Sequence, residues 1–284
     1  MVDLILVRYS EIGLKGRNRI VFERKLVDNI RSSLAKRQIK FSSIQKPRGR
    51  IIIETDERCG CLRCVFGIAS FSPAIDGGST IESAKASIEK ANLLAKLAKD
   101  KTFRVSCQRL DKSFVHGSAE IERELGSFIV EKKGVKARMK GFEFELGVEV
   151  IDGRMYLFTE RIGGQGGLPV GVEGKVVAMV AEERDLLAAL LMMKRGASII
   201  PALLKPIKIE MLEKFGNRER AVLIKKISEL DKIADESGAK AVVVGQTLDD
   251  FEELKLKTTT LRPLIAYNEN EIREKLEQFR KEIC

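Results

Sequence analysis

The segment 11–19 has the residue types of a phosphate-binding loop. Lys15, Arg17 and Arg19 alternate with Gly16 and Asn18 in it. Glycine lets the backbone approach a ligand closely, and cationic side chains contact the phosphates and sugars of nucleic acids. The three cations are therefore candidates for phosphate contacts. The alternative is that they are solvated surface charges.

Three cysteines at the spacing Cys59-x-Cys61-x-x-Cys64 have the chemistry of metal ligands. A structural zinc site needs four nitrogen or sulfur ligands, and the only histidine, His116, lies far along the chain. We therefore predict no metal site, and we interpret the three cysteines as small buried residues on a short helix. The odd total of five cysteines is typical of reduced thiols inside a cell.

The positive charge lies in the first part of the chain. The 284 residues carry a formal net charge of +10, of which residues 1–60 contribute +7, residues 61–165 contribute +3 and residues 166–284 contribute zero. A basic N-terminal unit joined to a neutral C-terminal unit is typical of a polyanion-binding module fused to a second domain. The alternative, which charge alone leaves open, is that scattered surface lysines keep the protein soluble.

Two classes of protein are excluded by the apolar pattern. The longest apolar runs, such as 51–53 and 242–244, are far too short to cross a membrane. Charged residues interrupt the N-terminal segment too early for a secretory signal peptide. We expect a cytoplasmic protein with no membrane contact.

Residues 1–160 have a mixed α+β pattern, with strands expected at 2–9, 50–54 and 102–109. A helix is predicted over 20–37, because Phe22, Leu26, Ile30 and Leu34 recur every fourth residue. A second helix is predicted over 79–99, where Ser79 and Glu82 have capping-box spacing. A third helix is expected from residue 118.

Residues 142–150 alternate between apolar and other residues, with glutamate at 143, 145 and 149. This period of two predicts a half-exposed strand, whose glutamates face the solvent. Asp152-Gly153 then predicts a turn into a partner strand over 154–160.

Beyond the glycine-rich segment 163–167, apolar strands alternate with helices. Strands are predicted at 175–180, 197–200 and 241–244, and helices at 182–194, at 218–236 and from Asn268. This alternation predicts an α/β domain with a parallel sheet.

Several separated segments, in one order over nearly the whole chain, are shared with a known family. They are Leu6–Arg19 (LVRYSEIGLKGRNR), Val65–Ile68 (VFGI), Ser70–Ala74 (SFSPA), Thr102–Val105 (TFRV), Gly166–Gly171 (GGLPVG), Leu191–Gly196 (LMMKRG) and Leu261–Ile265 (LRPLI). With these segments the chain resembles the tRNA 4-thiouridine synthetases, also called tRNA sulfurtransferases.

The resemblance implies a ferredoxin-like unit over 1–60, a THUMP RNA-binding domain over 61–165 and an abbreviated PP-loop ATPase-like domain over 166–284. In such proteins the first two units bind tRNA, and the PP-loop domain uses ATP and Mg²⁺ to adenylate a uridine before sulfur transfer. Together with the loop cations above, the resemblance makes seven residues candidates for RNA contacts: Lys15, Arg17, Arg19, Arg24, Arg104, Arg109 and Lys112.

The segment that corresponds to the PP-loop departs from the family pattern. A PP-loop reads Ser-Gly-Gly-x-Asp-Ser, and its backbone N–H groups close around phosphate at a helix N-terminus. Here the residues are Ala181, Glu182, Glu183, Arg184, Asp185 and Leu186. No glycine remains, and two glutamates stand where phosphates would bind. We interpret the segment as a degenerate nucleotide loop.

Two further parts of the catalytic machinery are missing. Gly245 runs directly into Gln246, without the segment that the family carries ahead of Gln-Thr-Leu. No cysteine lies between Gly166 and Ile283 to carry a persulfide, which leaves only Cys284.

These departures favour a tRNA-binding protein that is not catalytic on its own and needs no cofactor. One alternative is a working tRNA sulfurtransferase that binds ATP in an altered way. Another is a scaffold that forms a homodimer, as members of the family commonly do, and presents tRNA to a separate ATP-binding or sulfur-transfer partner. Nucleotide binding separates the first two hypotheses, because a synthetase must bind ATP.

Overall fold

The computed structural model describes residues 3–9, 11–14, 16–47 and 49–283. The chain divides into two compact units, and each is assembled from three separate segments. Unit 1 consists of Met1–Arg8, Ile39–Cys59 and Ser70–Gly163, and unit 2 of Tyr9–Gln38, Gly60–Ala69 and Gly164–Cys284. Within the described ranges, no helix has the length and apolar content needed to cross a membrane.

Unit 1 is built on a sheet that has nine strands among the described residues, in the order β2-β3-β1-β4-β8-β7-β5-β6, with β9 also paired to β4. Strand β5 runs parallel to β6 and β7, and the other pairs are antiparallel. The strands are β1 (Leu4–Arg8), β2 (Ser43–Gln45), β3 (Ile51–Glu54), β4 (Ser70–Asp76), β5 (Thr102–Arg109), β6 (Lys136–Ala137), β7 (Phe144–Ile151), β8 (Arg154–Phe158) and β9 (Ile162–Gly163).

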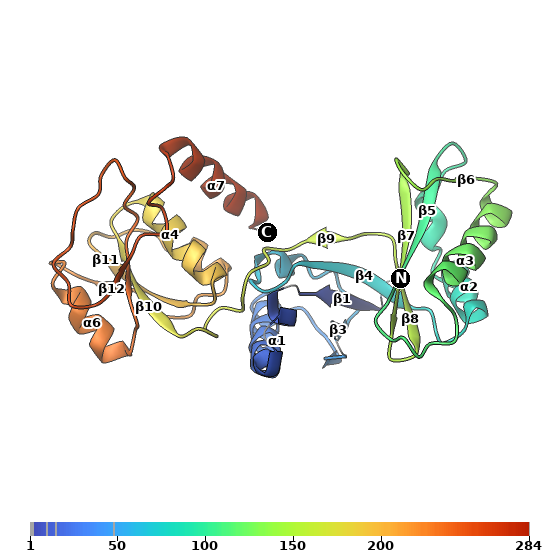
Figure 1. The fold of residues 1–284 in the computed structure, drawn as a ribbon, viewed down its shortest axis with the longest axis horizontal. Coiled ribbons are helices and arrows are strands. Elements are labelled where there is room, and N and C mark those ends of the chain that lie inside the picture. The colour runs from blue at the N-terminus through green and yellow to red at the C-terminus, as the bar shows by residue number, and fades with distance from the viewer. Residues whose placement is uncertain (1–2, 10, 15, 48, 284) are drawn as a thin grey trace. The chain divides into compact units, whose positions relative to one another are not determined.

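Two helices, α2 (Ile81–Lys90) and α3 (Ser118–Lys133), cover one face of β5, β7 and β8 (Figure 1). Their apolar side chains recur at helical spacing and meet the alternate residues of the strands. The core of this layer includes Ile81, Ala84, Ile88, Phe103, Ile121, Leu125, Ile129, Leu146 and Val148.

Helix α2 is shorter than the sequence pattern predicts. The expected helix over 79–99 ends at Lys90, because Asn92 takes a left-handed backbone conformation with φ of 50°. The cap also differs, since the Thr80 hydroxyl accepts from the Ser83 backbone N–H at 3.1 Å and the Ser83 hydroxyl accepts in return from Thr80. The expected pairing of Ser79 with Glu82 was wrong by one residue.

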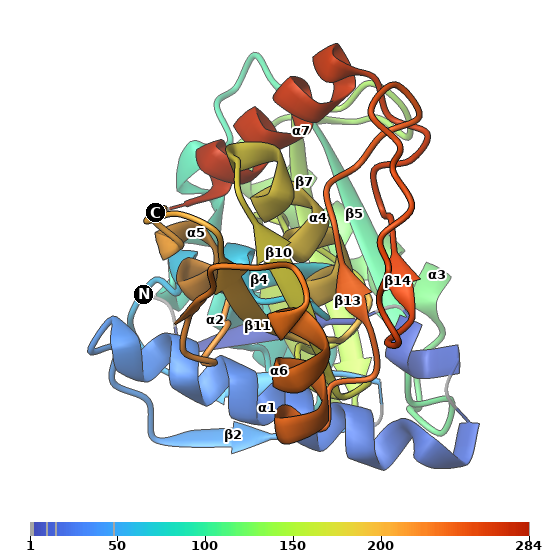
Figure 2. The ribbon, with the colours of Figure 1, turned by 90° about the vertical axis from the view of Figure 1, so that its left-hand side faces the viewer.

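Unit 2, as far as its residues are described, is built on five parallel strands in the order β12-β11-β10-β13-β14 (Figure 2). Helices α4, α5 and α7 pack on one face and α6 on the other. The elements are β10 (Lys175–Val180), β11 (Ser198–Leu203), β12 (Val222–Leu223), β13 (Val242–Val243), β14 (Thr260–Leu261), α4 (Glu183–Lys194), α5 (Glu210–Lys214), α6 (Glu229–Ser237) and α7 (Glu269–Glu282).

The helix predicted over 218–236 was wrong in its first half. Residues 221–224 are consecutive apolar residues, a pattern that suits a strand, and Val222 pairs with Ala202 of β11. Helix α6 begins only at Glu229, whose carboxylate accepts the backbone N–H groups of Lys225 and Lys226 at 2.8 Å.

The first helix, α1 (Arg19–Lys36), belongs to unit 2 with the 3-10 helix Gly60–Cys64. Phe22, Leu26, Ile30 and Leu34 are buried, as their spacing predicts. The predicted fold class, an α+β half followed by a parallel α/β domain, is confirmed.

Candidate functional site

The turn between β10 and α4 lies where ligands bind in many α/β sheets. The strands that follow β10 in the chain lie on both sides of it in the sheet. Strands β11 and β12 lie on one side of β10, and β13 and β14 lie on the other, so the direction of the strand order changes between β10 and β13. In open parallel sheets, the crevice at the carboxyl ends of two such strands is the usual ligand site. Here that place is formed by residues 181–186 and by Gly245, which follows β13.

The carboxylate of Asp185 occupies the backbone donors of this turn. Its Oδ2 accepts the N–H of Ala181 at 2.8 Å and the N–H of Glu182 at 2.9 Å. The side chain is buried, and a Cβ added at Gly245 would lie 2.1 Å from Asp185 Oδ1. Burial raises the pKa of Asp185, against the two backbone hydrogen bonds, which lower it. An acidic side chain of the protein thus takes the place an anion would have.

The outer side of the turn is a network of charged side chains. Arg184 donates to the Asp250 carboxylate and lies 3.6 Å from a Glu269 oxygen. Glu183 is paired with Arg280 of α7, and Glu182 is exposed at the helix N-terminus. Asp250 in turn accepts the Thr247 backbone N–H at 2.7 Å. The segment after β13 is thereby tied to the start of α4.

Of the predicted cations near the N-terminus, Arg19 is held in an internal cluster. Its Nε donates to Glu23 at 2.6 Å and its Nη2 donates to the Tyr9 hydroxyl at 2.8 Å. The Tyr9 hydroxyl itself donates to Glu23. Burial, followed by this bond to Glu23, raises the pKa of Tyr9 to about 12. Arg24 is exposed on α1, whereas Lys15 and the side chain of Arg17 lie outside the described residues.

The predicted cations of β5 and the loop after it differ in their surroundings. The half-buried Arg109 donates to the carbonyls of Lys112, Phe114 and His116, at 3.2, 3.4 and 2.6 Å. The guanidinium of Arg104 lies 5.7 Å from the ring centroid of Phe142. Lys112 is exposed. Arg109 therefore shapes the loop, and Lys112 is the cation of that loop which faces solvent.

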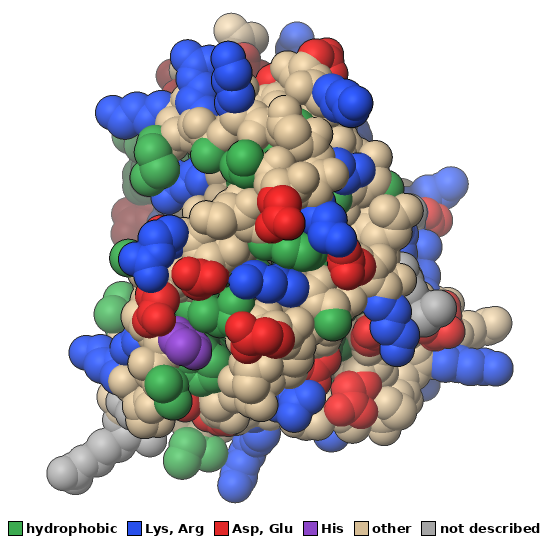
Figure 3. All heavy atoms as spheres, turned by 90° about the vertical axis from the view of Figure 1, so that its right-hand side faces the viewer, with side chains coloured by type: hydrophobic (Ala, Val, Ile, Leu, Met, Phe, Trp, Pro, Cys, Tyr) green, Lys and Arg blue, Asp and Glu red, His purple; other side chains and the backbone are tan. Residues whose placement is uncertain are grey.

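The face of the molecule in Figure 3 is not uniformly basic. Lys and Arg side chains gather at its upper edge, and its middle mixes acidic and basic side chains. Phosphate contacts on such a face would be made by individual cations rather than by a continuous basic surface.

Sequence reasoning missed a buried charge cluster on β7. Glu149 was expected to face solvent, but it has no exposed surface. Its two carboxylate oxygens accept from Arg8 and Arg50, each at 2.5 Å. The second face of β7 is covered as well: the Phe158 ring fills the space above Gly147, and Ile151 is buried in one cluster with Phe158, Leu4 and Leu6. A signal was available, because an arginine inside the apolar strand 4–8 needs a buried acidic partner.

The three clustered cysteines are buried, with Cys61 and Cys64 on the 3-10 helix Gly60–Cys64 and Cys59 just before it. This confirms their interpretation as small buried residues. Among the residues that the structure describes, no group of three or more His, Cys, Asp or Glu side chains is arranged to hold a metal ion.

Two protein-family models match this chain. The ThiI ferredoxin-like domain matches residues 4–72, and the THUMP domain matches residues 79–160. A Thermococcus kodakarensis protein named "Probable tRNA sulfurtransferase" is 33% identical, over 96% of this chain and 86% of its own length. That alignment runs over 329 positions, more than the 284 residues of this chain, so the relative has residues with no counterpart here. Several further relatives match over only 51% or 52% of their own length.

Two solved structures share the fold. PH1313 from Pyrococcus horikoshii has a TM-score of 0.87 at 28% identity, over 98% of this chain and 99% of its own. A 4-thiouridine synthetase in complex with RNA and ATP has a TM-score of 0.80 at 27% identity, over 98% of this chain and 85% of its own.

Proposed function

The chain belongs to the tRNA sulfurtransferase family, and from this premise we propose that it binds tRNA but does not carry out ATP-dependent chemistry at the 181–186 turn. The proposal assigns tRNA binding to residues 1–165, which hold all of the net positive charge. The chemistry that is missing here would come from a separate ATP-binding or sulfur-transfer protein.

The exposed Glu182 and Glu183 at the start of α4 carry this proposal, and the hydrogen bonds of Asp185 add to it. Backbone N–H groups at the start of a helix bind phosphate when they point into an open turn. The N–H groups of Ala181 and Glu182 instead point at Oδ2 of Asp185. A phosphate would have to displace a buried carboxylate, and its negative charge would then lie beside that carboxylate.

The other residues of the turn do not fit a triphosphate either. Glu182 and Glu183 stand at the positions of the two PP-loop glycines, where a side chain prevents close backbone approach. Both carboxylates are exposed at the helix N-terminus, and they repel phosphate oxygens. The nearest cations, Arg184 and Arg280, are paired with Asp250 and Glu183.

Two observations support tRNA as the partner. Residues 79–160 match the THUMP domain, and the similar 4-thiouridine synthetase was solved with RNA. With Arg109 and Arg19 engaged in internal hydrogen bonds, we propose that Arg24 and Lys112 make direct phosphate contacts. We propose the same role for Lys15, Arg17 and Arg104.

Calorimetry with ATP and Mg²⁺ tests the catalytic part of the proposal, and no binding heat is expected for the natural sequence. A variant with Ala181→Ser, Glu182→Gly, Glu183→Gly and Leu186→Ser restores the motif and should gain nucleotide affinity. A matched control, Glu252→Gly with Glu253→Gly, removes the same two charges from an exposed segment and should gain none. ATP binding by the natural sequence, or 4-thiouridine in tRNA after incubation with a sulfur donor, would make the sulfurtransferase alternative the correct one.

Filter binding of tRNA at a series of salt concentrations tests the RNA part on the full chain. If about four to six phosphates are neutralised, log K should fall with log[salt] with a slope of roughly −3 to −5. An affinity that does not change with salt, or an absence of tRNA binding at low salt, would contradict the proposal. The full chain is required because residues 9–38 belong to the same compact unit as residues 164–284.

A further inference from the structure

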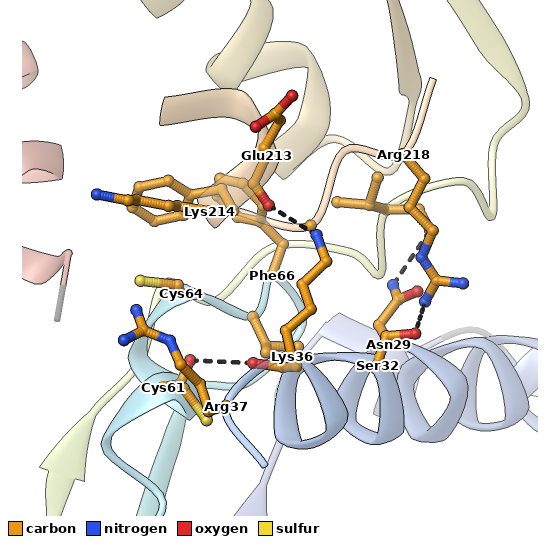
Figure 4. Close-up of a pocket in the computed structure, with 15 residues that line it drawn as sticks. Asn29, Ser32, Lys36, Arg37, Cys61, Cys64, Phe66, Glu213, Lys214 and Arg218 are labelled. Atoms are coloured by element: carbon orange, nitrogen blue, oxygen red, sulfur yellow. Dashed lines mark hydrogen bonds between the residues drawn. The ribbon is translucent and has the colours of Figure 1, made fainter. Parts of the chain in front are cut away.

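Unit 2 contains a cavity of about 220 Å³ that the proposed function does not use. It lies between the end of α1, the 3-10 helix Gly60–Cys64 and the segment that follows α5 (Figure 4). Its apolar wall is formed by Cys61, Cys64, Val65, Phe66, Val170 and Phe215. None of these residues belongs to the turn at 181–186, so the cavity is a separate feature.

Four cations line this cavity, from two segments far apart in the sequence. Lys36 and Arg37 come from the end of α1, Lys214 from the last turn of α5 and Arg218 from the segment after α5. Among the described lining residues, Glu213 is the one carboxylate, and Figure 4 shows it turned away from the space that Lys36 crosses. The described lining thus holds four cations against one carboxylate.

Hydrogen bonds across the cavity hold two of the cations in place. Lys36 Nζ donates to the Glu213 carbonyl at 3.3 Å. Arg218 donates to the Ser32 hydroxyl and, at 3.4 Å, to the Asp28 carbonyl. A lysine has three donors and an arginine five, so both retain donors for a ligand. Their positions are fixed before a ligand arrives, which lowers the cost of ordering them.

A simpler role for two of these cations is to offset the partial negative charge at helix ends. Lys36 lies in the last turn of α1 and Lys214 in the last turn of α5, where cations stabilise the helix. That role does not explain Arg218, four residues beyond α5. It also does not explain why all four cations border one apolar-walled cavity.

We propose that this cavity binds a small phosphomonoester with a compact apolar body. The cationic residues would hold the phosphate, and the apolar wall would receive the organic group. A phosphomonoester carries close to two negative charges at neutral pH, which suits four cations better than a monocarboxylate would. Arginine adds paired donors that match phosphate oxygens. The volume lies below the range of about 300–1,000 Å³ typical of drug-sized ligands, so the organic group is small.

Calorimetry of the full chain with three probes tests this site independently of tRNA and ATP. Phenyl phosphate has both the dianion and the apolar ring, inorganic phosphate lacks the ring, and benzoate has the ring with a single charge. Phenyl phosphate should bind about tenfold more tightly than either of the others, because each loses one of the two contributions. Equal affinity for all three probes, or no binding at millimolar concentration, would overturn the proposal.

Two double alanine variants test whether phenyl phosphate binds in this cavity. Lys214→Ala with Arg218→Ala should weaken phenyl phosphate binding about tenfold or more, because two charge-assisted contacts are lost. Lys225→Ala with Lys226→Ala is the matched control, since it removes two exposed cations of the same unit that do not line the cavity. Melting temperatures establish that both variants fold. An equal loss in the two double variants would show non-specific charge attraction and contradict the site.

A competition experiment identifies what carries the phosphate. A short RNA with a terminal phosphate is added to the phenyl phosphate complex, in parallel with the same RNA ending in a hydroxyl. If only the phosphorylated RNA displaces phenyl phosphate, the site binds an RNA end. If neither RNA displaces phenyl phosphate, the site binds a free phosphomonoester. Displacement by both RNAs alike would show that the terminal phosphate is not recognised, and would count against the proposal.

Discussion

The Glu149 carboxylate and the Arg8 guanidinium are 141 residues apart in the chain and meet at 2.5 Å in the interior of unit 1. Arg50 binds the second carboxylate oxygen, and the Arg8 guanidinium lies 4.6 Å from the ring centroid of Phe158. Burial lowers the pKa of Arg8, and Glu149 opposes this effect. The Glu149 carboxylate thus compensates two buried cations, Arg8 of β1 and Arg50, which directly precedes β3.

Replacing Glu149 by glutamine should destabilise the protein by about 3–5 kcal/mol, because it leaves two buried arginines without a countercharge. The free energy of unfolding in urea measures this effect. Glu143→Gln serves as the control: that side chain is exposed just before the same strand, and its replacement should change stability by less than about 0.5 kcal/mol. A small effect at Glu149 would mean that the arginines find other acceptors.

The burial of Asp185 should appear in the pH dependence of stability. Its pKa is raised from the ordinary value of 3.8, so in this range the folded state binds more protons at this site than the unfolded state does. The contribution of protonated Asp185 to the free energy of unfolding is full below pH 3.8, and it is lost as the pH rises through the raised pKa of the folded state. The stability of the natural protein relative to Asp185→Asn should therefore fall as the pH rises above 3.8. A difference that stays constant with pH would show that Asp185 is not desolvated.

The Tyr9 hydroxyl should ionise at unusually high pH. Its pKa is about 12, raised by burial and by the bond to Glu23, so a spectroscopic titration should show a tyrosine that ionises near that pH. Burial also raises the pKa of Tyr156, so substitution is needed to assign the step to Tyr9. Tyr9→Phe should remove that step. Glu23→Gln should lower the pKa, because the anionic acceptor is lost. The contribution of Tyr9 to the free energy of unfolding is full below pH 10, the ordinary pKa of tyrosine, and is lost as the pH rises through about 12.

Arg109 and Lys112 should differ when each is changed to alanine. Arg109 donates to three loop carbonyls, so its loss should destabilise the protein by about 1–3 kcal/mol and disorder the loop. Lys112 is exposed; its loss should leave stability unchanged and weaken tRNA binding by about 1 kcal/mol. Thermal unfolding and filter binding measure the two effects. Identical behaviour of the two variants would contradict this division of roles.

Much of the architecture could be predicted because it depends on local periodicity. The four-residue spacing of Phe22, Leu26, Ile30 and Leu34 marks a helix whatever lies beside it. The cap at Asn268 is equally local, and its side chain accepts the Glu271 backbone N–H at 3.0 Å. Elements that depend on distant partners were missed. Strand β12 has two residues and exists through its pairing with β11.

The sequence showed which residue types form the candidate site, but it did not show which of them contact one another. The sequence shows glutamates at 182 and 183, but not that Asp185 turns back to accept from residues 181 and 182. Glu149 is the clearest case. Alternation along one strand cannot reveal that residues of other strands, among them Leu4, Leu6 and Phe158, cover the second face of β7.

Unit 2 combines an early and a late part of the chain, so it can be completed only after its last segment, Gly164–Cys284, has been made. Asn29 of α1 binds the Val170 carbonyl, Lys36 binds the Glu213 carbonyl and Ser32 binds Arg218, across 141, 177 and 186 residues of sequence. Contacts so distant in sequence form slowly, since the intervening chain must first be brought together. During synthesis, α1 leaves the ribosome early but must wait for residues near 218 before it makes these contacts. Until then the contacts that tie α1 to Glu213 and Arg218 are absent.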